Sequence, residues 1–142
     1  MSGPEYPALY LKRGEDKRLR AGHLWVFSNE VDTAKSPLPE FPVGGPVWIL
    51  DASGKPLGTG YANPSTLICA RLVDRGGKPL DRSLITHRLN VALSLRERLR
   101  HEPFYRLVFG EADGLPGLVI DRFDDIVVAQ LNTAGMQAVK DE

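Results

Sequence analysis

The sequence has a single cysteine, no net charge and no long apolar run. One cysteine excludes an intrachain disulfide framework and any metal site built from clustered cysteines. No apolar run approaches the ~18 residues that span a bilayer. Residues 1–11 also lack the basic start and apolar stretch of a secretory signal peptide. We therefore expect a cytoplasmic protein with no membrane partner.

The composition is that of a globular protein rich in turns. At 142 residues, with 42% hydrophobic residues to build a core, the chain has room for one ordinary domain or two small ones. Its 14 glycines and 11 prolines exceed the average combined share, which is about 12%. This excess predicts many turns and short strands.

The zero net charge conceals an uneven distribution of charge. Residues 71–106 carry nine basic and four acidic groups, whereas residues 107–142 carry two basic and seven acidic groups. A second basic stretch lies within residues 9–29. Basic clusters attract the phosphate backbone of nucleic acids, but charge runs are also common on solvated helix faces. Charge alone leaves both interpretations open.

The first half of the chain has the pattern of short β-strands. Aromatic and β-branched residues favour strands, and clusters of Gly, Pro and Asn separate them. A short helix over 15–21 and a proline-rich loop over 35–46 interrupt the series. Strands are predicted over 8–12, 23–27, 47–51, 57–61 and 67–73.

The pattern changes after the glycine-containing segment 74–79. Asp81 is placed to cap a helix over 82–100. Strands are predicted over 105–109, 118–123 and 126–131, before a final helix of about ten residues. The predicted fold class is therefore mixed α/β and mainly β. The first of these helices has an apolar stripe at helical spacing, formed by Ile85, Leu89, Ala92, Leu93 and Leu99.

Two groups of polar residues are candidates for RNA binding, because cations hold phosphates while polar groups contact sugars and base edges. A solvated helix and an ordinary hairpin are the alternatives. We expect Leu19, Trp25 and Phe27 in the core, and Cys69 as a buried structural thiol. The first group is Lys12, Arg13, Lys17, Arg18, Arg20, His23 and Ser28, and the second is Tyr61, Asn63, Ser65 and Arg71.

The order of these segments resembles a PUA domain, and more narrowly the N-terminal PUA domain of the large-subunit ribosomal RNA cytosine-5 methyltransferases. The resemblance rests on segments 11–14 with 17–20, 23–28 and 60–71. The family often has Pro at the position of Leu24, and this difference leaves the strand pattern intact. Residues 105–123, continued by 130–136, are similar to the central domain of the same family.

The resemblance implies a PUA-like RNA-binding barrel over 1–74, a linker helix region over 75–103 and part of a small α+β central domain over 104–142. The family's catalytic domain is Rossmann-like and binds S-adenosylmethionine, and such a doubly wound sheet needs roughly 180 residues. We therefore expect that domain to be absent and this chain alone to be inactive, without a cofactor. S-adenosylmethionine is implied for the full-length parent.

Two hypotheses of function follow. In the first, the chain is the RNA-binding N-terminal portion of an S-adenosylmethionine-dependent rRNA cytosine-C5 methyltransferase, with large-subunit rRNA as its partner. In the second, it is a non-enzymatic protein-interaction module or homodimer, docking through its acidic part or an exposed edge strand. No catalytic or metal-ligating residue is predicted in this chain, including among Glu111, Asp113 and Asp121. Asp113-Gly114 and Asp124-Asp125 are typical of turns, and a divalent ion would need convergent oxygen ligands.

Overall fold

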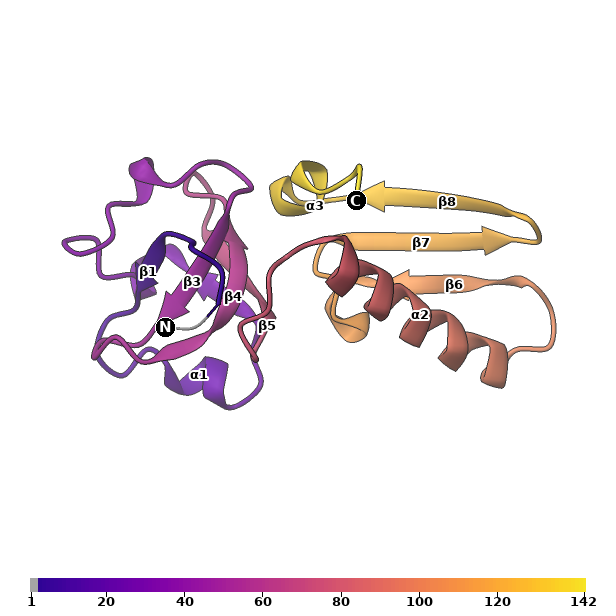
Figure 1. Cartoon of the computed structure of the whole chain (residues 1–142), viewed down its shortest axis with the longest axis horizontal. Coiled ribbons are helices and arrows are strands. Elements are labelled where there is room, and N and C mark those ends of the chain that lie inside the picture. The colour runs from indigo at the N-terminus through magenta and orange to yellow at the C-terminus, as the bar shows by residue number, and fades with distance from the viewer. Residues whose placement is uncertain (1–2) are drawn as a thin grey trace. The chain divides into compact units, whose positions relative to one another are not determined.

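The computed structural model describes residues 3–142, and the chain divides into two compact units. Unit 1 ends at Leu80, and unit 2 runs from Asp81 to Glu142. Unit 1 is built mainly of β-strands, whereas unit 2 combines a three-stranded sheet with one long helix (Figure 1). The predicted fold class, mixed α/β and mainly β, is confirmed.

Unit 1 is a curled five-stranded sheet with the strand order β1-β3-β4-β5-β2. The β1–β3 pair is parallel, and the other neighbours are antiparallel. An isolated bridge between Leu11 and Val31 continues the curl beyond β1. A short helix, α1 (Lys17–Arg20), lies between the first two strands. The strands are β1 (Ala8–Tyr10), β2 (Trp25–Phe27), β3 (Pro46–Leu50), β4 (Pro56–Ala62) and β5 (Ile68–Asp74).

The inner face of this sheet forms the hydrophobic core. Val26, Ala70 and Ala62 form one cross-strand row on β2, β5 and β4, and all three are buried in the core. Because successive residues of a strand point to opposite faces, the next row faces away from the core. That row holds Trp25 and Arg71, and Trp25 is 39% exposed.

The sheet position of Trp25 corrects one expectation. Among the three hydrophobic residues expected in the core, Leu19 is 2% exposed and belongs to it. Phe27 is only half-buried, and Trp25 is exposed. The expectation for Trp25 is wrong because an alternating strand at a sheet edge sends every second large side chain outward.

Gly60 sits where two strands approach closely. A Cβ atom at this position would overlap the carbonyl oxygen of Arg71 on β5. The β4–β5 register also shifts between Thr59 and Gly60. Only a residue without a side chain therefore fits at this position.

Replacing Gly60 by alanine should lower the free energy of unfolding by about 1–3 kcal/mol, because the added methyl group pushes β5 out of register. Urea denaturation followed by circular dichroism measures this change. Gly76→Ala is the matched control, since its Cβ would meet only the flexible Asp74 carboxylate at 3.2 Å. Equal stability of the two variants would contradict the close-approach argument.

Cys69 is buried against the core and donates its Sγ–H to the carbonyl of Val26 at 3.5 Å. Burial raises the pKa of the Cys69 thiol to about 11. A thiol in this state is a poor nucleophile at neutral pH, because the thiolate is the reactive form. The expectation of a buried structural cysteine is confirmed.

This pKa predicts a loss of stability at alkaline pH. The unfolded thiol ionises near pH 8.5, so stability is full below that pH and falls as the pH rises toward the folded-state pKa of about 11. The loss should reach about 2 kcal/mol at pH 10. Urea unfolding at pH 7.5 and pH 10 checks it. The pH effect in Cys69→Ala should be smaller by that amount, and an identical effect would refute the assignment.

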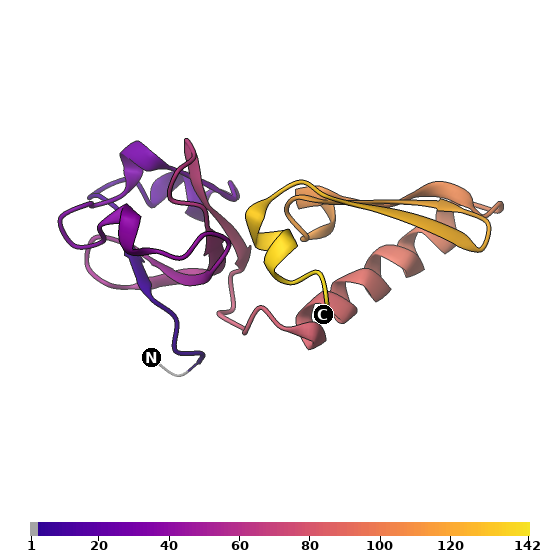
Figure 2. The same cartoon turned by 90° about the horizontal axis from the view of Figure 1, so that it is seen from above.

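Unit 2 is a three-stranded antiparallel sheet with the order β6-β7-β8. Figure 2 shows helix α2 running along one face of this sheet. The predicted Asp81 cap is confirmed, since its side chain accepts a hydrogen bond from Leu84 N at 3.1 Å. The elements are α2 (Arg82–Leu99), β6 (Phe104–Phe109), a 3₁₀ turn (Gly110–Asp113), β7 (Leu118–Phe123), β8 (Ile126–Leu131) and α3 (Ala134–Ala138).

The apolar stripe of α2 is only partly buried. Ala92 is buried, and Leu99 is 65% exposed in the last turn. The residue missing from the predicted stripe is Leu84, which is buried beside the cap. The final helix is five residues long instead of the ten expected. Three residues of β8 are also well exposed, namely Ile126, Val127 and Val128.

Candidate nucleic-acid interface

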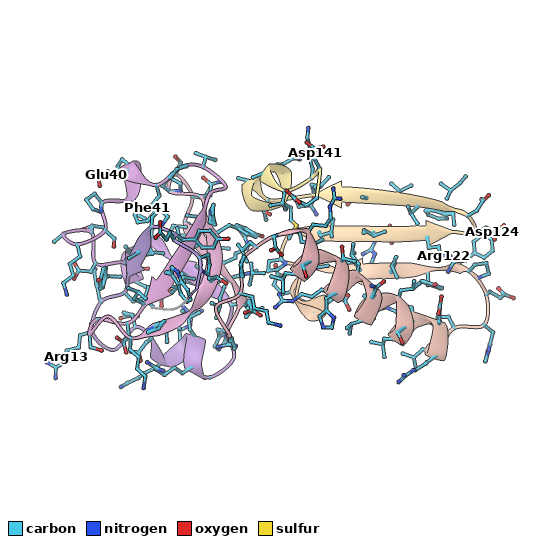
Figure 3. All side chains as sticks on the ribbon, viewed as in Figure 1. Arg13, Glu40, Phe41, Arg122, Asp124 and Asp141 are labelled. Atoms are coloured by element: carbon cyan, nitrogen blue, oxygen red, sulfur yellow. The ribbon has the colours of Figure 1, made fainter. Side chains whose placement is uncertain are left out.

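The basic residues that precede and begin α1 project into solvent. Lys12, Arg13 and Lys17 are exposed, and Arg13 points away from the ribbon in Figure 3. Among the described residues, none of these three side chains has an ion pair or a hydrogen-bond partner. We call these three residues the open cations. Their charges are available to bind an anion.

Arg18 is basic by sequence but has a structural partner. Its Nη1 lies 3.2 Å from Oε2 of Glu30, a residue that is only 6% exposed. Its guanidinium also covers the Phe27 ring, 5.0 Å from the centroid. Oε1 of Glu30 accepts a hydrogen bond from Phe27 N at 2.8 Å. Arg18 therefore neutralises a buried carboxylate that anchors the end of β2.

Arg20 is tied to two carboxylates. Its Nε donates to Asp16 at 2.6 Å, and its Nη2 donates to Asp51 at 2.9 Å. Hydrogen bonds from Ser53 and Arg20 hold the pKa values of Asp51 and Asp16, respectively, below their usual range. Because these pKa values are lowered on folding, the two carboxylates contribute stability above about pH 4 and lose it as the pH falls further.

Arg75 positions the same helix, a role that the sequence did not reveal. Its Nη1 donates to the Leu19 carbonyl at 2.6 Å, and its Nη2 donates to the His23 carbonyl at 3.2 Å. A cation at the carbonyls in and just after the last turn stabilises the C-terminal end of a helix. No local pattern signals this contact, since 56 residues separate Arg75 from Leu19.

An arginine–tryptophan pair lies on the outer face of β2 and β5. The guanidinium of Arg71 lies 5.8 Å from the centroid of the Trp25 ring. Nε of Arg71 is buried without a hydrogen-bond partner in the described residues. A preformed ring–guanidinium pair offers a stacking surface, and aromatic rings with arginine are typical contacts of single-stranded nucleic acid.

Pairing of β2 with β5 brings part of the two predicted groups together. Ser28 N donates to the Leu67 carbonyl at 2.8 Å, so Ser28 lies beside the turn that carries Asn63 and Ser65. Ser65 is exposed and Asn63 is half-buried, whereas Tyr61 is 5% exposed. His23 is exposed, and its carbonyl accepts a hydrogen bond from Arg75. The open cations, the Trp25–Arg71 pair and this turn are thus three separate points on unit 1.

Residues 3–142 contain no group of three or more His, Cys, Asp or Glu side chains that could hold a metal ion. In the same range, no helix is both long and apolar enough to cross a membrane.

Comparison with known proteins gives this arrangement a context. Residues 9–75 match the family of PUA-like domains. The chain is 38% identical over 139 residues to "Ribosomal RNA large subunit methyltransferase I" of Salmonella gallinarum and 37% identical to the protein of that name from Aliivibrio fischeri. Each match covers 94% of this chain but only 34% of the relative. The chain therefore spans about a third of the length of these relatives.

Solved structures share the fold of the chain. Two crystal structures, one described as a methyltransferase complexed with SAH and one as a SAM-dependent methyltransferase from Streptococcus mutans, superpose with a TM-score of 0.78 at 18% identity. Each superposition covers 95% of this chain and 35% of the chain in the solved structure. At that identity, the likeness concerns the fold alone.

The contacts of Glu30 predict that its carboxylate stabilises the end of β2. Glu30→Ala should lower the free energy of unfolding of unit 1 by about 2 kcal/mol, because Phe27 N and Arg18 lose a shared carboxylate. Glu40→Ala is the control, since Glu40 is exposed. Thermal or urea unfolding measures both variants. A Glu30 variant as stable as the control would show that the carboxylate does not anchor this segment.

Proposed function

We propose that the chain is the RNA-binding, N-terminal portion of an S-adenosylmethionine-dependent rRNA (cytosine-C5) methyltransferase that acts in the cytoplasm. Unit 1 recognises structured large-subunit rRNA, and the methyl transfer belongs to a catalytic domain outside these 142 residues. The match of residues 9–75 to PUA-like domains and the named relatives support this proposal. The domain limits proposed are 1–74 for the PUA-like domain, 75–103 for the linker helix region and 104–142 for the partial central domain.

The observation that carries the proposal is the division of the basic residues around α1. Arg18 and Arg20 are held by carboxylates, and Arg75 by backbone carbonyls. These contacts fix α1, while the open cations keep their full charge in solvent. A rigid element that presents unpaired charges is suited to phosphate binding, since the charges do not have to leave internal partners first.

The remaining predicted residues add RNA contacts at the other points of unit 1. In the proposal, Lys12, Arg13 and Lys17 hold phosphates, with Arg18 and Arg20 beside them. Trp25 joins the set as a stacking residue because its ring is exposed and covered on one side by Arg71. His23, Ser28, Asn63 and Ser65 supply polar contacts and Arg71 a further cation, whereas Tyr61, which is only 5% exposed, packs within unit 1.

No residue of the described chain is proposed to react with substrate. The buried Cys69 has a raised thiol pKa, which opposes a nucleophilic role. S-adenosylmethionine is therefore proposed as the cofactor of the full-length parent and not as a ligand of this chain.

Removing the open cations should weaken RNA binding. The variant K12A/R13A/K17A should bind an rRNA hairpin at least tenfold more weakly at 0.1 M salt and should lose up to three ion contacts. The slope of log K against log salt should then become shallower by about 2–3, since each phosphate contact contributes about 0.7–0.9. Filter binding across a salt series measures both quantities.

The control variant removes the same number of charges elsewhere. Lys55, Lys78 and Lys140 are exposed lysines outside the α1 segment, and K55A/K78A/K140A changes the net charge equally. Equal weakening by the two triple variants would reduce the interaction to net charge and contradict the proposed surface. Arg18 and Arg20 are unsuitable for this test because their removal also breaks internal ion pairs.

A second candidate function, a dimerisation or protein-interaction module, is favoured by one observation. Strand β8 is a sheet edge, and Ile126, Val127 and Val128 on it are between 48% and 62% exposed. An uncharged apolar edge strand pairs readily with another chain. Sedimentation at several concentrations tests this candidate, which requires a tight homodimer without affinity for RNA. Val127→Lys should abolish such a dimer, whereas the exposed Asp125→Lys on the preceding turn serves as its control.

A further inference from the structure

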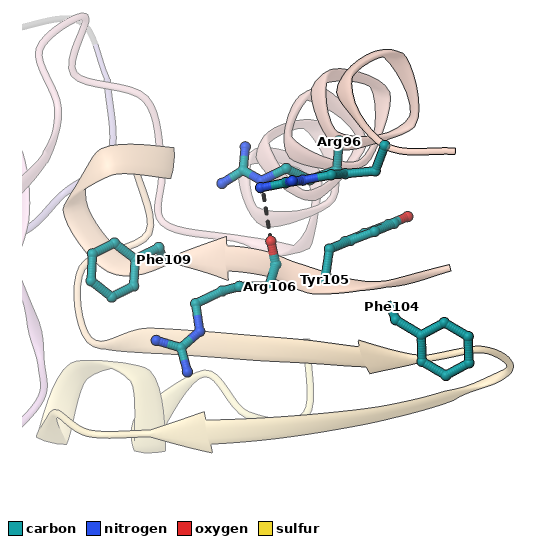
Figure 4. A pocket seen from close by; sticks show the side chains of 6 residues that line it. Arg96, Phe104, Tyr105, Arg106 and Phe109 are labelled. Atoms are coloured by element: carbon teal, nitrogen blue, oxygen red, sulfur yellow. Dashed lines mark hydrogen bonds between the residues drawn. The ribbon is translucent and has the colours of Figure 1, made fainter. Parts of the chain in front are cut away.

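An open pocket is lined by residues of unit 2 alone. It has a volume of about 550 Å³ and lies between the last turns of α2 and strand β6 (Figure 4). β6 is an edge strand of its sheet. The lining side chains are Arg96, Arg100, Phe104, Tyr105, Arg106 and Phe109.

Two side chains already make hydrogen bonds to backbone groups of β6. Arg96 Nε donates to the Arg106 carbonyl at 3.2 Å, as the dashed line in Figure 4 marks. Asp113 Oδ2 accepts from Phe109 N at 2.7 Å and from Arg96 Nη2 at 2.8 Å. A peptide strand adds to a sheet through free backbone groups at its edge. These contacts therefore oppose an added β-strand as the occupant of the pocket.

The cationic groups of the pocket differ in their availability. Arg96 is only 18% exposed in its ion pair with Asp113, and Arg106 makes two hydrogen bonds to Asp121. Arg100 is exposed, and no described side chain pairs with it. The acidic neighbours Glu97 and Glu102 do not line the pocket. Arg100 is thus the cation that remains for an anionic ligand.

The aromatic rings of the pocket also differ in their availability to a ligand. The Tyr105 ring lies 5.5 Å from the Arg122 guanidinium, and the Phe109 ring lies 5.5 Å from that of Arg106. Phe104 is 61% exposed and has no cation over its ring in the described structure. An exposed aromatic ring and an unpaired guanidinium that line one pocket are two elements with which proteins bind single-stranded nucleic acid.

We propose that this pocket binds a short segment of single-stranded RNA, with a phosphate at Arg100 and a base stacked on Phe104. The proposal rests on the RNA-binding function proposed above and adds a contact in unit 2 of a different kind. The open cations of unit 1 contact phosphates of structured RNA, whereas the pocket requires an unstacked base. Binding of structured RNA therefore reports on the open cations, and binding of single-stranded RNA reports on the pocket.

The test uses the full chain and a fluorescent oligouridine of eight nucleotides, measured by anisotropy. Phe104→Ala should weaken binding at least fivefold, because a stacked base is lost. Phe104→Leu keeps the apolar bulk without the aromatic face and should weaken binding by a similar factor. The matched control is Phe123→Ala, since Phe123 faces Phe104 across the strands and is 51% exposed but does not line the pocket. That variant should bind like the unaltered chain.

Arg100→Ala should also weaken oligouridine binding, and the salt slope should become shallower by about 0.7 for one lost phosphate contact. Arg98→Ala on the same helix removes an equal charge outside the pocket and should have a clearly smaller effect. Equal effects of Arg100→Ala and Arg98→Ala, or of Phe104→Ala and Phe123→Ala, would overturn the proposal. Circular dichroism of each variant establishes that the fold is retained.

The variant K12A/R13A/K17A separates this proposal from the proposed function. With hairpin binding weakened, it should still bind oligouridine, and adding Phe104→Ala should abolish that binding. If the hairpin is bound through the open cations but oligouridine binding is indifferent to Phe104 and Arg100, the pocket proposal fails and the function stands. If no hairpin is bound while the pocket variants reduce oligouridine binding, the function fails and the pocket stands. If neither RNA is bound, both are wrong.

Discussion

The buried carboxylate of Glu30 is the contact on which the arrangement of unit 1 depends. One of its oxygens holds the backbone of Phe27 at the end of β2, and the other pairs with Arg18 of α1. The carbonyl of the same residue accepts a hydrogen bond from Lys12 N at 2.9 Å. A single residue therefore joins the turn before α1, the helix itself and the edge strand. Burial of a charge is costly unless it is paired and hydrogen-bonded, so these segments must come together in this way.

The two units use arginine differently. In unit 1, arginines hold α1 in place and leave the open cations in solvent. In unit 2, Arg96 and Arg106 join α2, β6 and β7 into one framework through Asp113 and Asp121. In both units, paired arginines lie close in sequence to basic residues that remain unpaired in the described structure. Counting basic residues in the sequence therefore overstates the charge that a ligand meets.

Much of the fold follows from local patterns in the sequence. The strands and the capped helix after Asp81 depend on neighbouring residues in the chain, and they are found as predicted. The shortness of α1 and α3 was not predictable in the same way, because helix ends depend on the packing around them.

The candidate site was less accessible to sequence reasoning. Glu30, the partner of Arg18, lies 12 residues away, and Asp51, one of the two partners of Arg20, lies 31 residues away, so these pairs depend on the folded sheet. The exposure of Trp25 depends on which face of β2 meets the core, and an aromatic residue in a strand is compatible with either face. The pocket of unit 2 combines residues from α2 and β6, and no motif marks it in advance.

The strand order of unit 1 has a consequence for its folding kinetics. The first strand pairs with β3, so that Leu9 meets Ile49, and β2 pairs with β5, so that Trp25 meets Arg71. Both pairings close long loops before any favourable contact forms, and such non-local topologies fold in milliseconds to seconds rather than microseconds. During synthesis, β2 has no sheet partner until residue 74 has emerged. Arg75, which holds the end of α1, follows β5 in the chain, so the contacts that fix α1 are complete only after all five strands have been synthesised.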